Sequence, residues 1–270
     1  MNSEPGVNSQ KFAQTNIALY NQMIEKGYSE DNILLVKRAY EFAAKRRMLY
    51  LRASGKPFIC HLVGTASVLV ELGRSPEAVA AGLLHAMYLK GSDFGVGVGL
   101  DQRRDVLRRE FGEVIENLVH QYHKFKWKYS YGQVSEVIDS EELDPDTKEI
   151  LVIKMANEVD DFLDNAVAYM GNNSSATVKK KDVGWRLEYM RSTKQEMSTA
   201  ATKMGLPDLS SWIEQLVDSN LETNVYPSMR SGKVKTYKVK PPSVIDTRKS
   251  RKAKPKKSIY RRLYDKVFKT

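Results

Sequence analysis

The sequence of 270 residues contains one cysteine, Cys60, and no long apolar run. A single thiol cannot form an internal disulfide, so a disulfide-stabilised secreted fold is excluded. A membrane-spanning helix needs about 20 consecutive apolar residues, and no stretch approaches that length. The start, M-N-S-E-P-G, has neither the basic residues nor the apolar run of a secretory signal. We therefore expect a cytoplasmic protein, with peripheral association on the inner face of the membrane as an alternative.

The sequence also lacks the patterns of a β-protein or a repeat protein. No segment keeps up the apolar–polar alternation of a strand, and no period repeats. Apolar residues instead recur at three- and four-residue spacing, as at Leu35, Ala39 and Phe42. We therefore predict an all-α fold. Helices are expected over residues 10–26, from Ser29 onwards, over 59–72 and 76–89, from a cap at Asp101 toward Phe111, and over 113–125, 146–169, 183–203 and 208–219.

The charge is divided unevenly between the body of the chain and its end. The whole sequence carries a formal net charge of +10, from 43 Lys and Arg against 33 Asp and Glu. Residues 228–270 contain sixteen basic and two acidic residues, which leaves 27 basic and 31 acidic residues in 1–227. The body is therefore mildly acidic, and any argument about an anionic partner concerns the tail.

The basic tail has two parts of different composition. Its first part is rich in Lys, Arg, Pro and Ser and cannot bury enough apolar surface to fold by itself. From Ile259 onwards, apolar side chains recur at i, i+1, i+4, i+5, i+8 and i+9, which is typical of an amphipathic helix. The predicted segments are a flexible N-terminus (1–9), a helical domain (10–220), a basic disordered linker (221–257) and a basic amphipathic helix (258–270).

The polar side of this terminal helix is predicted to bind an anionic surface. An apolar face beside cations suits the interface of an anionic membrane, whereas an arm that binds nucleic acid needs no apolar face. We rank the membrane above nucleic acid, and packing of the helix on its own domain or on another protein stays open. The cations concerned are Arg261, Arg262, Lys266 and Lys269.

Four blocks of sequence, in order, resemble the (p)ppGpp hydrolase domain of stringent-response enzymes. Residues 52–61, R-A-S-G-K-P-F-I-C-H, resemble the segment R-x-S-G-E-P-Y-I-x-H of that domain. Residues 80–85, A-A-G-L-L-H, resemble the A-x-G-L-L-H-D helix that gives HD proteins their name. Residues 111–119 and 150–157 resemble two further helices, F-G-x-x-V-x-x-L-V and I-L-V-K-L-A-D. The resemblance implies an HD-domain-like helical bundle that binds a nucleotide or another phosphorylated small molecule.

A second resemblance is closer. Residues 61–66 read H-L-V-G-T-A, and residues 81–88 read A-G-L-L-H-A-M-Y. They are similar to a poorly characterised HD-derived family that carries H-L-x-G-T and A-G-L-F-H-S-x-Y in place of the active HD motif. That family lacks the metal-binding aspartates, so this resemblance implies a pseudoenzyme.

Most positions that carry chemistry in an active HD site are changed. The resemblance places the two histidine ligands on His61 and His85, and the two aspartate ligands on Ala86 and Asn157. Alanine cannot bind a metal, and a neutral amide does not offset the charge of the cation as a carboxylate does. The catalytic Glu-Asp pair falls on residues 89–90, Leu and Lys. We therefore assign no catalytic residue.

Three residues define the predicted ligand pocket: Arg52, His61 and His85. Arg52 matches an arginine that contacts the nucleotide in the hydrolase family, and it either still binds a phosphate or a base or is an ordinary solvated arginine. We interpret the two histidines as core residues bonded to backbone or water, and expect no cofactor. Weak binding of a divalent metal, manganese or iron, by His61 and His85 is the alternative.

Two other groups could supply the missing ligands. Asp160, Asp161 and Asp164 share a helical face with Asn157, but one turn rises about 5.4 Å, too far for a ligand about 2 Å from the metal. We interpret these aspartates as a solvated acidic face. The second group has the i, i+4, i+7 spacing of a metal clamp, although a polar helix face is the commoner cause of that spacing. It consists of Glu116, His120 and His123.

These observations rank three functions. The first is a non-catalytic binding or regulatory protein that retains a nucleotide or phosphate pocket. The second is a metal-dependent phosphohydrolase with altered ligands. The third is a scaffold whose basic tail docks on an anionic membrane or on nucleic acid.

Overall fold

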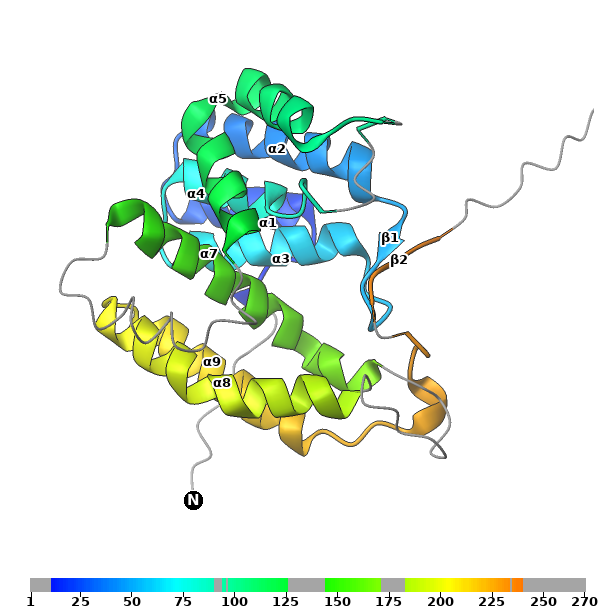
Figure 1. Cartoon of the computed structure of the whole chain (residues 1–270). Coiled ribbons are helices and arrows are strands. Elements are labelled where there is room, and N and C mark those ends of the chain that lie inside the picture. The colour runs from blue at the N-terminus through cyan, green and yellow to red at the C-terminus, as the bar shows by residue number, and fades with distance from the viewer. Residues whose placement is uncertain are drawn as a thin grey trace, which may run out of the picture. The chain divides into compact units, whose positions relative to one another are not determined.

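Figure 1 shows a computed structural model of the chain, which describes residues 11–89, 94–95, 97–125, 144–170, 183–233 and 235–239. Side chains are described over the same ranges except at 183–190 and 192–193. The described residues form helices and one two-stranded ribbon, which confirms the prediction of an all-α fold. The chain divides into two units, residues 1–239 and 240–270, and the second unit lies outside the described residues, as does the predicted segment 1–9.

The first four helices begin at residues that suit a helix start. The hydroxyls of Ser29 and Ser75 accept hydrogen bonds from backbone N–H groups three residues later, which satisfies donors that the first turn leaves free. Pro57 and Pro76 stand at two of the starts, where the missing N–H costs nothing. The helices are α1 (Asn16–Glu25), α2 (Glu30–Arg47), α3 (Phe58–Glu71) and α4 (Pro76–Leu84).

The next helix, α5 (Leu100–Lys124), is bent in the middle. Gly112 has a φ of 83°, in the left-handed region that favours glycine, and separates two helical stretches. The sequence correctly predicts a break here, but the cap is not Asp101. Gly99 is the N-cap, and its N–H donates to Oε1 of Gln102 at 3.0 Å.

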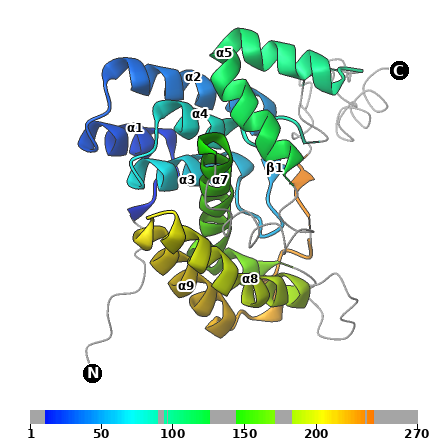
Figure 2. The ribbon, with the colours of Figure 1, turned by 60° about the vertical axis from the view of Figure 1, so that its left-hand side comes forward.

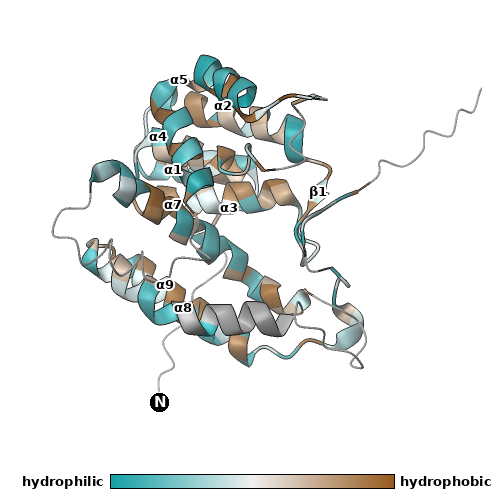
Figure 3. Ribbon diagram, viewed as in Figure 1, coloured by the Kyte–Doolittle hydropathy of each residue, from teal (hydrophilic) through white to brown (hydrophobic). Residues whose placement is uncertain are grey.

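The central helix is α7 (Pro145–Phe162), which packs against α3, α4, α5 and α9 (Figures 1 and 2). Apart from Lys154, its residues from Ile150 to Phe162 are all buried. The hydropathy colouring in Figure 3 marks apolar positions on α3 and α7, between the two ends of the bundle. The 3₁₀ segment η3 (Leu163–Tyr169) follows α7 directly. The helices α8 (Val183–Lys203) and α9 (Pro207–Glu222) pack against each other in the lower part of Figure 1.

Three helix ends differ from the sequence-based prediction. The first helix begins at Asn16 rather than near residue 10, and α4 ends at Leu84 rather than near residue 89. The helix predicted to continue to residue 169 ends at Phe162, because Asp164 and Asn165 have φ values of 56° and 52°. Apolar periodicity continues through η3, so spacing alone does not reveal this end. No helix among the described residues is both long and apolar enough to cross a membrane.

A short β-ribbon joins the segment between α2 and α3 to the segment that follows α9. The strand β1 (Tyr50–Leu51) pairs antiparallel with β2 (Tyr237–Lys238), with Tyr50 opposite Lys238. Between α9 and β2 lies a second 3₁₀ segment, η4 (Pro227–Met229). We call residues 223–239 the strap.

The strap corrects the prediction of a disordered linker over residues 221–257. The N–H of Val239 donates to the carbonyl of Leu49 at 2.7 Å, and the hydroxyl of Ser231 donates to the carbonyl of Ala53. Composition showed that this segment could not fold by itself, but its hydrogen-bond partners come from the helical body. Residues 240–257 of the predicted linker and the predicted helix 258–270 lie outside the described residues.

A buried asparagine holds the end of α7. Asn220 on α9 is 1% exposed, and its side-chain nitrogen donates to the carbonyls of Phe162 at 2.7 Å and Leu216 at 2.9 Å. We expect Asn220→Ala to lower the free energy of unfolding by about 1–3 kcal/mol, because buried carbonyls would lose this donor. Urea unfolding measures the difference. The neighbouring Ser219→Ala is the control, since Ser219 makes an exposed contact, and equal stabilities of the two variants would contradict this role.

Candidate functional site

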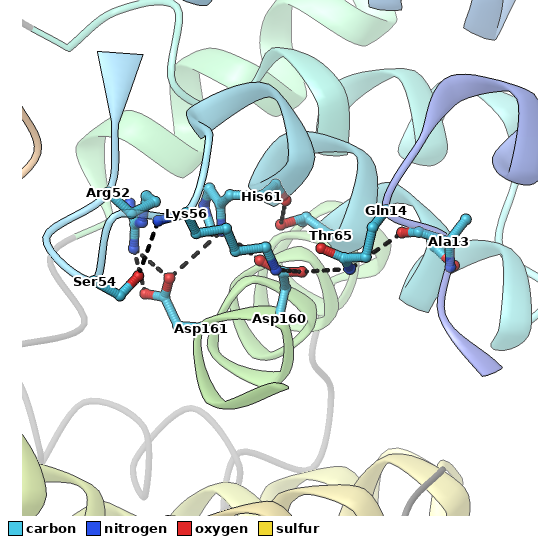
Figure 4. Close-up of polar contacts among 10 residues, drawn as sticks. Ala13, Gln14, Arg52, Ser54, Lys56, His61, Thr65, Asp160 and Asp161 are labelled. Atoms are coloured by element: carbon cyan, nitrogen blue, oxygen red, sulfur yellow. Dashed lines mark hydrogen bonds and ion pairs between the residues drawn. The ribbon is translucent and has the colours of Figure 1, made fainter. Parts of the chain in front are cut away.

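The candidate site lies where the loop after β1 and the start of α3 meet the end of α7. The loop is a tight turn, in which the N–H of Arg52 donates to the carbonyl of Lys56 at 2.8 Å. The turn directs the side chains of Arg52 and Lys56 toward α7, as Figure 4 shows. His61 follows in the first turn of α3. Two cations and one imidazole therefore face the last turn of α7.

Asp160 is the centre of this arrangement and is fully buried. One carboxylate oxygen lies 2.7 Å from Nδ1 of His61. The other accepts from Nζ of Lys56 at 2.8 Å and from Nε2 of Gln14 at 3.1 Å (Figure 4). Both oxygens thus have donors, as a buried carboxylate requires.

Asp161 is 5% exposed and forms the second ion pair. A guanidinium nitrogen of Arg52 donates to both of its carboxylate oxygens, and Nδ1 of His61 lies 3.4 Å from Oδ1. The guanidinium also lies 5.5 Å from the ring centre of Phe58. Arg52 is therefore held in an ion pair beside an aromatic ring, and the solvated alternative for this residue is wrong.

The pairing fixes the proton of His61. Burial alone would raise the pKa of Asp160, but Lys56 and His61 outweigh burial and the pKa lies below its ordinary value. The ionised carboxylate accepts, so Nδ1 of His61 donates the proton. In the neutral ring Nε2 then carries a lone pair, and it has no hydrogen-bond partner among the described residues.

Gly64 allows α7 to come this close to α3. A Cβ at this position would lie 2.6 Å from Cγ of Asp160 and 2.7 Å from Nε2 of Gln14. One residue later, the hydroxyl of Thr65 donates to the carbonyl of His61 at 3.0 Å. The H-L-V-G-T motif therefore places the histidine, leaves room for the carboxylate and holds the first turn.

His85 lies beside His61, as the resemblance implies. The two rings meet edge to face with centres 5.2 Å apart, and Nδ1 of His85 contacts the carbonyl of Gly82 at 2.7 Å. Burial, with help from His61, lowers the pKa of His85 well below its ordinary value, so the ring is neutral at pH 7. Arg52, His61 and His85 are thus brought together, but the two histidines are 0% and 4% exposed.

The two positions matched to aspartate ligands hold no carboxylate in the structure. Ala86 is fully buried, and its carbonyl accepts from Nη2 of Arg47 at 2.7 Å. Asn157 is 8% exposed on α7. Leu89 is exposed, and Lys90 lies outside the described residues.

The interpretation of the α7 aspartates as a solvated acidic face is wrong for two of the three. Asp160 and Asp161 are buried against cations, and only Asp164 is exposed. The misreading has a physical cause. Charged residues on a helix predict solvent exposure only when no opposite charges face them. Here the opposite charges are those of Lys56 and Arg52, on a loop about 100 residues away in the sequence.

The group at 116, 120 and 123 is not a solvated polar face either. Glu116 is 1% exposed and His120 is 6% exposed. The carboxylate of Glu116 braces the two halves of α5 across the bend at Gly112. Its donors are Tyr88 at 2.9 Å, Arg104 at 2.7 Å and Arg108 at 3.2 Å.

One group of three side chains in the described part of the chain has the donors for a divalent metal. The residues are His61, Asp160 and Asp161, and one potential ligand atom from each lies within 4.8 Å of the other two. A metal ligand must present a lone pair, but the ring nitrogen of His61 that faces the carboxylates, Nδ1, carries the proton. Lys56 and Arg52 already neutralise both carboxylates. This group therefore does not fit a divalent metal, and two cations of the chain balance its charge. The four tail cations, Arg261, Arg262, Lys266 and Lys269, lie outside the described residues.

The described residues form a helical domain in which His61 and His85 lie side by side. Next to them, the carboxylates of Asp160 and Asp161 are paired with Lys56 and Arg52. Residues 46–126 match the model of a domain of unknown function, DUF6817. That match covers Arg52, His61 and His85 but stops before α7. It therefore leaves out Asp160 and Asp161.

Part of the chain is similar in sequence to curated proteins named as GTP pyrophosphokinases and as a pyrophosphohydrolase. It is 31% identical over 130 residues to a GTP pyrophosphokinase of Streptomyces coelicolor, which covers 46% of this chain and 14% of that protein. It is 28% identical over 189 residues to a probable GTP pyrophosphokinase of Mycobacterium leprae, a match that covers 68% of this chain and 22% of that protein. It is 29% identical over 129 residues to a guanosine-3′,5′-bis(diphosphate) 3′-pyrophosphohydrolase of Aquifex aeolicus, a match that covers 46% of this chain and 17% of that protein. The chain spans less than a quarter of each of these relatives.

Gly64 offers a test of the α3–α7 contact. We expect Gly64→Ala to lower the free energy of unfolding by about 1–3 kcal/mol or more, because the added methyl overlaps Asp160. The cost should shrink when Asp160→Ala is present, since the overlapping carboxylate is then gone. A double-mutant cycle by urea unfolding measures this coupling. An equal cost in both backgrounds would mean that Asp160 does not approach Gly64.

The ion pair at Asp160 predicts a pH dependence. A carboxylate whose pKa is lowered by folding stabilises the folded state above the unfolded pKa, about 3.9, and loses this as pH falls through the folded value. We expect Asp160→Asn to cost about 3 kcal/mol at pH 7, because Lys56 loses its counter-charge, and to cost less below about pH 4. Asp164→Asn, at an exposed position, is the control for urea unfolding at each pH. A cost for Asp160→Asn that stays constant from pH 7 to 3 would be the contrary result.

Proposed function

We propose that the chain is a non-catalytic binding or regulatory protein, built on a helical domain related to the (p)ppGpp hydrolases and acting without metal-dependent hydrolysis. One observation carries the proposal. Each carboxylate beside His61 is paired with a cation of the chain itself, Asp160 with Lys56 and Asp161 with Arg52. Metal-dependent hydrolysis needs anionic ligands that hold the cation and its water. Around the histidine pair, Ala86 and Asn157 supply none.

A pocket beside this network is the proposed ligand site. Its volume is about 430 Å³, within the range of small-molecule sites. Lys56 is one of its lining residues, and the pocket presents both polar groups and apolar surface, as a nucleotide or phosphorylated small molecule requires. The residues that line it are Gln14, Ser54, Lys56, Pro57, Cys60, Asp164, Ala166 and Tyr169. The buried His61 and His85 would then support the pocket from behind rather than contact the ligand.

A second candidate function is a metal-dependent phosphohydrolase with altered ligands. The observation that favours it is the orientation of the two histidines. Nδ1 of His61 is held by Asp160 and Nδ1 of His85 by the carbonyl of Gly82, the outer contacts that metal-binding histidines usually make. Both Nε2 atoms would then be available to a divalent cation such as manganese. Two neutral ligands would bind it weakly.

Hydrolysis of (p)ppGpp with manganese separates the two candidates. We expect the wild-type protein to be no faster than His85→Ala, because the two described carboxylates beside His61, those of Asp160 and Asp161, are paired with Lys56 and Arg52 and are not free to hold a metal and its water. A clear manganese-dependent rate that His85→Ala abolishes would favour the enzyme. The restoring variant is Ala86→Asp with Asn157→Asp, which should bind manganese tightly if the histidine pair is aligned as proposed.

Binding of the unhydrolysed nucleotide tests the pocket itself. With GDP and ppGpp as probes in calorimetry, Tyr169→Ala should weaken binding about three- to tenfold, because the ligand loses an aromatic contact. Tyr226→Ala is the matched control, since Tyr226 is 77% exposed and does not line the pocket. Equal affinities for the two variants, or no binding by the wild type, would count against this ligand class.

A further inference from the structure

Two segments that meet at the β-ribbon contain no acidic residue. Residues 42–57, from the last turns of α2 to the start of α3, have five Lys and Arg and no Asp or Glu. The strap, residues 223–239, has four Lys and Arg and likewise no acid. Strand pairing between β1 and β2 joins them. The exposed Glu41 stands just before the first segment and interacts with Lys45, so Lys45 marks the edge of this acid-free surface.

Exposed apolar side chains lie at the same place. Met48 is 62% exposed, Leu49 is 41% exposed and Val239 is 40% exposed. The hydrogen bond from the N–H of Val239 to the carbonyl of Leu49, at 2.7 Å, brings the two segments into contact here. The exposed Lys45, Lys235 and Lys238 stand on the same segments, and Nζ of Lys238 lies 5.4 Å from the ring centre of Tyr50. We call these six residues the ribbon face: Lys45, Met48, Leu49, Lys235, Lys238 and Val239.

We infer that the ribbon face is a docking surface for an anionic lipid membrane. Apolar side chains among cations, with no carboxylate on either segment, match the interface between acyl chains and anionic headgroups. The chain continues from Val239 into residues 240–270, which hold twelve Lys and Arg and two acids. That segment attracts the same headgroups, and the ribbon face sets which side of the folded body meets them. None of the six residues lines the proposed ligand pocket, so this inference is independent of the proposed function.

Nucleic acid is the competing partner and is less well matched. Phosphate backbones would accept the same lysines, but they offer nothing to three exposed apolar side chains. A lipid interface uses both features. The loop before α3, which supplies Ser54 and Lys56 to the proposed pocket, is hydrogen-bonded to the strap, because the hydroxyl of Ser231 donates to the carbonyl of Ala53. Docking of the ribbon face would therefore also bring that loop to the membrane side of the protein.

Vesicle binding by the full chain tests the ribbon face. The probes are phosphatidylcholine vesicles with about one third phosphatidylglycerol, and vesicles of phosphatidylcholine alone. Met48→Asp should weaken binding to the anionic vesicles about tenfold, because a charge replaces an inserted apolar side chain. Lys235→Gln with Lys238→Gln should weaken it about 25-fold, at about fivefold for each cation. The control is Ile17→Asp on α1, which changes the charge equally at a residue that is also 62% exposed.

The inference is supported when the ribbon-face variants lose anionic-vesicle binding and Ile17→Asp binds like the wild type. Circular dichroism and urea unfolding confirm that all variants are folded. Equal binding by Met48→Asp and Ile17→Asp overturns it, because the tail alone would then be the anchor. Absence of vesicle binding by the wild type also overturns it. In that case, binding of a single-stranded oligonucleotide that falls with the lysine pair would assign the surface to nucleic acid.

Discussion

Asp160 and Asp161 place two carboxylates inside the bundle, and a buried charge costs several kcal/mol unless partners surround it. The partners come from separate parts of the chain. Gln14 precedes α1, Arg52 and Lys56 belong to the loop before α3, and His61 lies in α3. The close approach at Gly64, the tight turn of the loop and the capped end of α7 all serve this one requirement. Removing a single partner would leave a charge that the interior cannot solvate.

The same arrangement supports the proposed function without a metal. In an HD site a divalent cation joins helices that carry histidines and carboxylates. Here Lys56 and Arg52 join α3 and α7 through carboxylates on the last turn of α7. These cations are covalent parts of the chain, so chelators cannot remove them. Lys56 also lines the proposed pocket, so under the proposed function a ligand would contact one of the ion pairs that hold the helices together.

The all-α fold and most helices could be predicted from apolar spacing, and the resemblance placed His61 beside His85 correctly. The carboxylate pair could not be found in this way, because burial of Asp160 depends on a loop distant in sequence. One signal was present: Lys56 stands where the resembling hydrolase segment has glutamate, and a lysine at that position can pair with a carboxylate where a glutamate cannot. The strap was missed for a similar reason. Its composition favours disorder, and its order comes from the carbonyls of Leu49 and Ala53.

The bond between Ser231 and Ala53 joins residues 178 positions apart. During synthesis, the loop that carries Arg52 and Lys56 leaves the ribosome long before the segment that closes over it. The carboxylates of α7 also follow the loop by about 100 residues, so its cations have neither partner nor cover while the first helices form. Closing so long a loop of chain is slow compared with forming local helices. The site is therefore completed last, when the chain has been made as far as Val239, and a nascent chain that stops earlier has the helices without the finished loop.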